Sequence, residues 1–119
     1  MKRRLRLSRQ REFQAAISGK RFYSGKALVA FAIPSQLDET RVGVTVSRAV
    51  KTSVDRNRAR RRLRELARTK LLGGDSPLTE RGIRYDVVLI ARPATLTSTF
   101  AELSAEAEQA ALRLSKLNS

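Results

Sequence analysis

The sequence predicts an α/β (α+β) fold, a two-layer sandwich in which helices cover one small sheet. Three observations predict it. The chain has 119 residues, which suits a single domain spanning 1–119 rather than two domains. Three segments carry the alternating or continuous apolar pattern of strands. Three others carry apolar residues at helical spacing, next to residues that cap helices.

The first helix is expected from Arg9 to about Ser18. Ser8 is placed to cap its start, and Gly19 ends it. Its apolar side chains fall at i, i+3 and i+4 and form one stripe: Phe13, Ala16 and Ile17.

Two extended segments follow, at 21–34 and 41–47, and we expect them to pair as a hairpin. Val29, Phe31 and Ile33 alternate on one face of the first segment, and Pro34 stops it. In the second, one face holds three valines, Val42, Val44 and Val46, and the other holds Gly43, Thr45 and Ser47.

The second half of the chain reads as helix, strand, helix. A helix capped by Asp55 or Ser53 should run to about Leu72 and stop at Gly73-Gly74, and residues 73–82 have the composition of a mobile loop. Residues 85–91 form an apolar run typical of a buried strand. The last helix should start at Phe100, where Thr99 and Glu102 form a capping box. Its buried stripe is predicted to be Phe100, Leu103, Ala107, Ala110 and Leu114.

The charge is large and unevenly distributed. The net charge is +14. Residues 1–26 and 41–70 carry 20 Lys and Arg against 3 Asp and Glu, whereas the rest of the chain carries 5 against 8. A basic face of this kind indicates a polyanionic partner, and nucleic acid is the common one.

The segment 55–72 concentrates this charge on a helix. Ala59, Leu63, Leu66 and Ala67 fall on one stripe that can pack on the sheet. A second stripe points outward and holds Asn57, Arg61, Arg64 and Arg68, with Arg60 at its edge, while Arg58 and Arg62 lie on the other flank. Such a row is either a solvated charged face or a row of phosphate contacts, and the one-sided composition favours phosphate contacts.

The chain has only six aromatic residues, and four of them lie within residues 13–31: Phe13, Phe22, Tyr23 and Phe31. Rings beside a basic helix can stack the bases of single-stranded RNA, although each could equally belong to the core. As a group, they favour a platform for a single strand.

Catalysis by the chain itself is not expected. It contains no Cys and no His, so disulfides, zinc sites and the commonest general base are excluded. The carboxylates show no close pairing of the two-metal nuclease type, and Glu102, Glu106 and Glu108 read as solvated helix residues. No apolar run is long enough to span a membrane, and no signal peptide is evident, so we expect a cytoplasmic protein.

The segment "RVGVTVSRAVKTSVDRNRARRRLREL", followed by "YDVVLIARP", resembles the protein subunit of bacterial ribonuclease P. The opening "RLRLSRQREFQAAISGKR" is also similar to the start of that family. The resemblance covers nearly the whole chain.

The resemblance implies an αβββαβα order with a four-stranded sheet, similar to ribosomal protein S5 domain 2, and a left-handed crossover that carries the arginine helix. It implies that the partner RNA, using Mg²⁺ held mainly by that RNA, removes the 5′ leader of precursor tRNA, and that this chain supplies no catalytic residue and no metal ligand. Its partners would be the catalytic RNA subunit and precursor tRNA, with no membrane and no evident protein partner. The expected contacts with the RNA subunit are Arg56, Asn57, Arg58, Arg60, Arg61, Arg64 and Arg68. The expected contacts with the leader are Phe13, Phe31, Ser47 and Arg48.

Other readings of the residues stay open at this point. A ribosomal or other structural RNA-binding protein would have the same composition and no role in cleavage. A DNA-binding protein is disfavoured because no helix-turn-helix pattern precedes the arginine helix. A membrane-surface helix is disfavoured because the apolar stripe holds only Ala and Leu.

Overall fold

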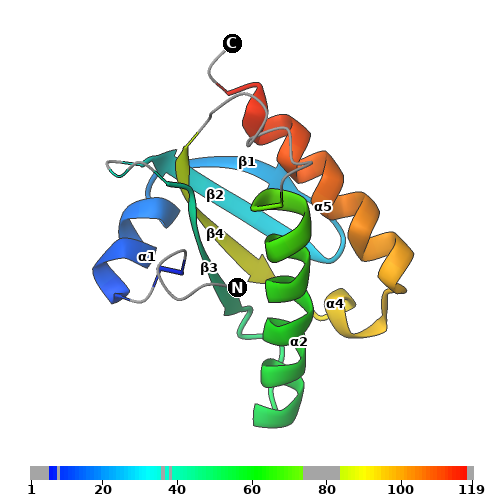
Figure 1. The fold of residues 1–119 in the computed structure, drawn as a ribbon. Helices are drawn as coiled ribbons and strands as arrows, with labels where there is room; N and C mark the ends of the chain where they lie inside the picture. Colours follow the sequence, from blue (N-terminus) through cyan, green and yellow to red (C-terminus); the bar gives the residue numbers. More distant parts are fainter. Residues whose placement is uncertain (1–5, 8, 36, 38, 74–83, 118–119) are drawn as a thin grey trace.

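A four-stranded sheet separates two layers of helices in the computed structural model of the chain (Figure 1), which describes residues 6–7, 9–35, 37, 39–73 and 84–117. The strands lie in the order β1-β2-β4-β3. Their bounds are Lys20–Ser24 for β1, Leu28–Pro34 for β2, Arg41–Val46 for β3 and Tyr85–Ala91 for β4. The predicted mixed fold and its αβββαβα order are confirmed.

The main core lies between one face of the sheet and the helices α2 and α5, which are Ser53–Leu66 and Phe100–Ser115. Val42, Val44 and Val46 point into this core, as their alternation predicts. Helix α1, Gln10–Ile17, covers part of the opposite face (Figure 1) and packs there around Ala16 and Val88. The sheet therefore has one closed face and one partly covered face.

The predicted hairpin between residues 21–34 and 41–47 is wrong. The first segment turns back on itself near Gly25, so β1 and β2 form the hairpin. β4 lies between β2 and β3, antiparallel to β2 and parallel to β3. The physical reason is burial: β4 has the most continuously buried side chains of the four strands, and its place between β2 and β3 covers both of its faces.

The N-cap of helix α2 precedes both predicted caps, by one residue for Ser53 and by three for Asp55. Thr52 is the N-cap, and its side chain accepts a hydrogen bond from the Asp55 backbone N–H at 3.1 Å. The predicted inner stripe is confirmed, because Ala59, Leu63 and Leu66 are buried. The helix continues into a π-helical turn, Ala67–Leu71, before it ends at Leu72.

The remaining helices confirm some expectations and correct others. The capping box of Thr99 and Glu102 is present on α5, but Phe100 is 60% exposed and does not belong to the buried stripe. A short helix not predicted from the sequence, α4, spans Ala94–Thr97. Helix α1 has Arg9 as its N-cap; the predicted cap Ser8, and residues 74–83 of the predicted loop, lie outside the described residues.

Candidate nucleic-acid interface

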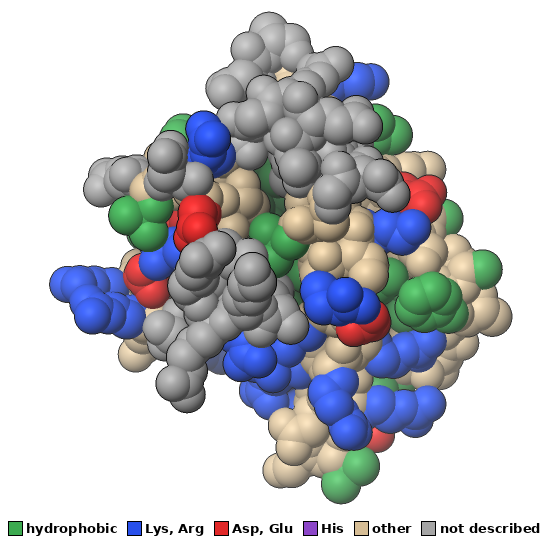
Figure 2. All heavy atoms as spheres, in the orientation of Figure 1, with side chains coloured by type: hydrophobic (Ala, Val, Ile, Leu, Met, Phe, Trp, Pro, Cys, Tyr) green, Lys and Arg blue, Asp and Glu red, His purple; other side chains and the backbone are tan. Residues whose placement is uncertain are grey.

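The outward side of α2 carries a surface hollow of about 400 Å³ that is lined by Asn57, Arg60, Arg61 and Arg64. Lys and Arg side chains gather over this part of the molecule (Figure 2). Asn57 Oδ1 accepts a hydrogen bond from Arg60 Nη1 at 3.0 Å, which explains why a neutral amide lies among the arginines. The predicted outward stripe thus forms one concave, positively charged surface.

The charges in this hollow repel one another. Partial burial, and then the positive charges of Arg6 and Arg60, lower the pKa of Arg64 below its ordinary value. Arginine stays protonated at neutral pH despite such a shift, so the charge persists and a bound anion would relieve its repulsion. Within the part of the chain that the structure describes, no carboxylate forms an ion pair with Arg60, Arg61 or Arg64.

Two arginines of the helical segment, Arg56 and Arg62, donate hydrogen bonds to backbone carbonyls of neighbouring segments. Arg56 donates from Nη1 to the carbonyls of Ser47 and Val50, both at 3.0 Å, and so ties the start of α2 to the end of β3. Arg62 donates to the carbonyls of Thr95 and Ser98, at 2.7 and 2.9 Å. The sequence cannot reveal these bonds, because the Arg62 acceptors lie more than thirty residues away in the chain.

The other two predicted arginines of the helix are exposed. Arg58 lies on the flank that faces α5. Arg68 pairs with Glu65, and this hydrogen bond lowers the pKa of Glu65 and raises that of Arg68. Arg58 forms no ion pair with a described carboxylate and can bind an external anion, whereas the charge of Arg68 is partly neutralised by Glu65.

Phe13 and Phe31 lie on the partly covered face of the sheet. Phe31 of β2 is aligned across the sheet with Val88 and Gly43. The ring of Phe13 lies over Gly43, where a Cβ atom would come 2.5 Å from Phe13 Cζ. Both rings are half-buried. Phe22 and Tyr23 are buried in the main core, so the predicted aromatic platform is wrong for these two.

Ser47 and Arg48 follow directly after β3. The Ser47 backbone N–H donates to the Ala91 carbonyl at 2.9 Å and extends the pairing with β4. Its hydroxyl accepts a hydrogen bond from the Ala49 backbone N–H at 3.2 Å. The Arg48 side chain is exposed. The hydrogen bonds from Arg56 to the carbonyls of Ser47 and Val50 fix the loop that carries Ser47 and Arg48, two of the four predicted leader contacts.

An ion-pair network holds α1 against the sheet. Arg41 of β3 contacts Glu12 of α1 at 2.7 Å and Asp86 of β4 at 2.9 Å. The hydrogen bond to Asp86 raises the pKa of Arg41. Sequence reasoning did not assign this role, although the Arg of the "RVG" motif was the available signal.

A second network fixes the hairpin of β1 and β2 to α5. Glu106 accepts hydrogen bonds from the Tyr23 hydroxyl and from the Ala27 backbone N–H, both at 3.0 Å. The interpretation of Glu106 as a solvated helix residue is therefore wrong. Its partners lie about eighty residues earlier in the chain, so helical spacing alone could not identify them.

The described residues contain no group of three or more His, Cys, Asp or Glu side chains arranged to hold a metal ion. None of their helices is long and apolar enough to cross a membrane.

The family model described as Ribonuclease P matches residues 1–115. The chain belongs to the ribonuclease P protein family. The Ribonuclease P protein component of Dehalococcoides mccartyi strain 195 is 38% identical over 103 residues, covering 87% of this chain and 78% of that protein. The component from Symbiobacterium thermophilum is 37% identical over 110 residues, covering 92% and 90%.

Solved structures of ribonuclease P proteins share the fold. The RNase P protein of Staphylococcus aureus, at 2.0 Å, matches with a TM-score of 0.72 and 20% identity over 97% of this chain and 98% of its own. The Thermotoga maritima protein matches with a TM-score of 0.64 and 22% identity over 85% and 89%. Family membership makes this chain a protein component of a bacterial ribonucleoprotein, the endoribonuclease ribonuclease P, which processes tRNA.

Proposed function

We propose that this chain binds the catalytic RNA of ribonuclease P through the outward side of α2 and the 5′ leader of precursor tRNA through the partly covered face of the sheet. It would thereby assist removal of the leader, with catalysis by the RNA. The observation that carries the proposal is the hollow of Asn57, Arg60, Arg61 and Arg64, whose arginines form no ion pair with a described carboxylate.

Phosphate groups suit this hollow. Each guanidinium can donate two parallel hydrogen bonds to phosphate oxygens, and each phosphate that is neutralised releases counterions into solution. Partial burial, and then the positive charges of Arg6 and Arg60, lower the pKa of Arg64, and a bound anion would offset both effects. The buried stripe behind the arginines keeps the row in place, so little order has to be created on binding.

The leader site rests on a different set of contacts. Phe13 and Phe31 are half-buried on one sheet face, so an edge or face of each ring is available to an unpaired base. Ser47 and the exposed Arg48 follow the end of β3, where Arg48 could bind a phosphate of the same strand. Arg56 and Arg41 would act as positioning residues, because they fix this loop and α1.

In our proposal, cleavage of precursor tRNA requires Mg²⁺, and the ion would be held mainly by the catalytic RNA. The described carboxylates are not grouped as a metal site. We therefore assign no ligand for the ion to this chain and derive no step of the reaction through it.

The double variant Arg61→Ala plus Arg64→Ala tests the phosphate contacts. Its affinity for the catalytic RNA should fall, and the slope of log K against log salt should become shallower by roughly 1.4–1.8, the value for two lost phosphate contacts. Both side chains point away from the core, so circular dichroism should show an unchanged fold.

The matched control is Lys20→Ala plus Lys116→Ala, which removes the same charge from two exposed positions, one on the edge strand β1 and one after the end of α5. This control variant should keep the wild-type slope of log K against log salt. If the arginine variant also keeps the wild-type slope and affinity, the outward row of α2 is a solvated face and the proposal fails.

A further inference from the structure

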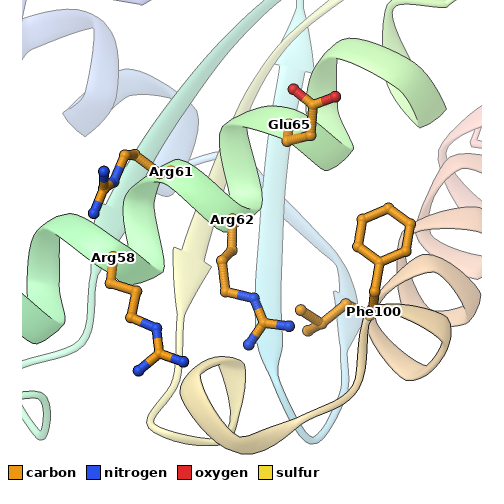
Figure 3. A pocket seen from close by; sticks show the side chains of 6 residues that line it. Arg58, Arg61, Arg62, Glu65 and Phe100 are labelled. Carbon is orange, nitrogen blue, oxygen red and sulfur yellow. The ribbon is translucent and has the colours of Figure 1, made fainter.

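A second hollow, of about 390 Å³, lies between α2 and the start of α5 (Figure 3). Arg58, Arg61, Arg62 and Glu65 reach it from α2, and Phe100 and Leu103 reach it from α5. Leu103 is fully buried and forms an apolar floor, whereas Phe100 is 60% exposed. A large aromatic ring left in solvent beside arginines has no role in the core.

The position of Phe100 is fixed by its surroundings. Thr99 caps α5, with its N–H bonded to Glu102 at 2.8 Å and its hydroxyl bonded to the Glu102 N–H at 3.1 Å. The backbone before it is tied to α2 by the bonds from Arg62 to Thr95 and Ser98. The backbone that carries the exposed ring is thus held in place, which reduces the entropy lost when a ligand binds to the ring.

The hollow has distinct apolar, cationic and anionic parts. Phe100 and Leu103 provide the apolar part, and Arg58 provides an exposed cation. Glu65, further along α2, adds a carboxylate that would repel a phosphate and accept hydrogen bonds from base amino groups. A nucleotide matches this arrangement, with its base toward Phe100 and its phosphate toward Arg58.

This hollow is continuous with the phosphate-binding surface of α2. Arg61 lines both hollows, since it also borders the one formed by Asn57, Arg60 and Arg64. An RNA strand held by those arginines would therefore pass the rim beside Phe100. This continuity favours RNA over a protein partner.

We propose that the hollow between α2 and α5 binds one unpaired nucleotide of the catalytic RNA, with its base stacked on Phe100 and its phosphate bound by Arg58. The proposal rests on the function proposed above, because it takes the catalytic RNA as the partner. It adds an aromatic contact at the start of α5 to a surface otherwise made of charges.

Three substitutions at one position test the stacking. Phe100→Ala and Phe100→Leu remove the aromatic face, and each should raise the Kd for the catalytic RNA roughly 5- to 150-fold, as expected for the loss of one stacked base. Phe100→Trp keeps an aromatic face and should bind at least as tightly as the wild type. The control is Leu112→Ala, which removes an exposed apolar side chain from a later turn of the same helix and should leave the Kd unchanged.

The outcomes separate this proposal from the function on which it rests. Thermal melting should be unchanged in all variants, because the Phe100 ring is mostly in solvent. Wild-type affinity in Phe100→Ala would overturn the stacked nucleotide, and this hollow would then be open to a protein partner. Wild-type affinity in Phe100→Leu alone would show an apolar contact and would also overturn stacking. If these variants bind normally while Arg61→Ala plus Arg64→Ala binds weakly, the function proposed above survives and only this inference fails.

Discussion

Gly43→Ala should damage the proposed leader site by displacing the ring of Phe13. The added methyl group would lie 2.5 Å from Phe13 Cζ, 2.6 Å from Cε1 and 3.1 Å from Leu7 Cβ. Alanine is intrinsically better than glycine inside a strand by about 0.5–1 kcal/mol, so a loss of stability would have to come from this contact. Overpacking of this kind costs about 1–3 kcal/mol.

A double-mutant cycle identifies the cause. The free energy of unfolding is measured in urea for the wild type, Gly43→Ala, Phe13→Leu and the double variant. Leucine is shorter than phenylalanine, so the Gly43→Ala penalty should shrink by about 0.5–3 kcal/mol in the Phe13→Leu background. Gly43→Ala should also weaken binding of precursor tRNA more than binding of mature tRNA.

Two results would refute this reasoning. The first is a Gly43→Ala protein that is more stable than the wild type by about 0.5–1 kcal/mol, the full intrinsic preference for alanine, which would mean that the ring of Phe13 moves without cost. The second is an equal penalty in both backgrounds, which would mean that Phe13 is not the residue that glycine accommodates.

Substitutions of Phe31, Thr52 and Tyr23 each test a single contact. Phe31→Ala should weaken binding of precursor tRNA by about 1–3 kcal/mol and leave mature tRNA unaffected; equal losses for both, with a lower Tm, would place Phe31 in the core. Thr52→Ala should cost about 1 kcal/mol in urea unfolding, and Ser53→Ala should cost far less if Thr52 alone is the cap. Burial, and then the hydrogen bond to Glu106, raise the pKa of Tyr23 from 10.0 to about 12. The stability from Tyr23 is therefore complete below pH 10 and is lost as the pH rises toward 12, by about 2 kcal/mol; a Tyr23→Phe protein that loses as much over this range would contradict it.

Local patterns were predicted well from the sequence. The alternation of Val42, Val44 and Val46 identified the core face of β3, and helical spacing identified the buried stripe of α2. Both patterns depend only on the geometry of one element. The outward arginines followed from the same geometry.

Contacts between distant segments could not be predicted in this way. The insertion of β4 between β2 and β3 depends on pairing between strands that lie far apart in the chain, so the expected hairpin was wrong. Phe100 falls on the predicted stripe of α5, but the side chains opposite it are arginines of α2 rather than aliphatic residues. Arg56, Arg62 and Glu106 bind groups supplied by other elements, which no spacing within one helix indicates.

We propose that this chain assists removal of the leader by binding both the catalytic RNA and precursor tRNA. Cleavage of precursor tRNA by the catalytic RNA at low Mg²⁺, measured with and without the protein, tests it most directly. We predict that the wild-type protein accelerates cleavage and that Arg61→Ala plus Arg64→Ala does so only at higher protein concentration. Unchanged cleavage in the presence of bound wild-type protein would contradict the account and indicate a structural RNA-binding protein with no role in cleavage.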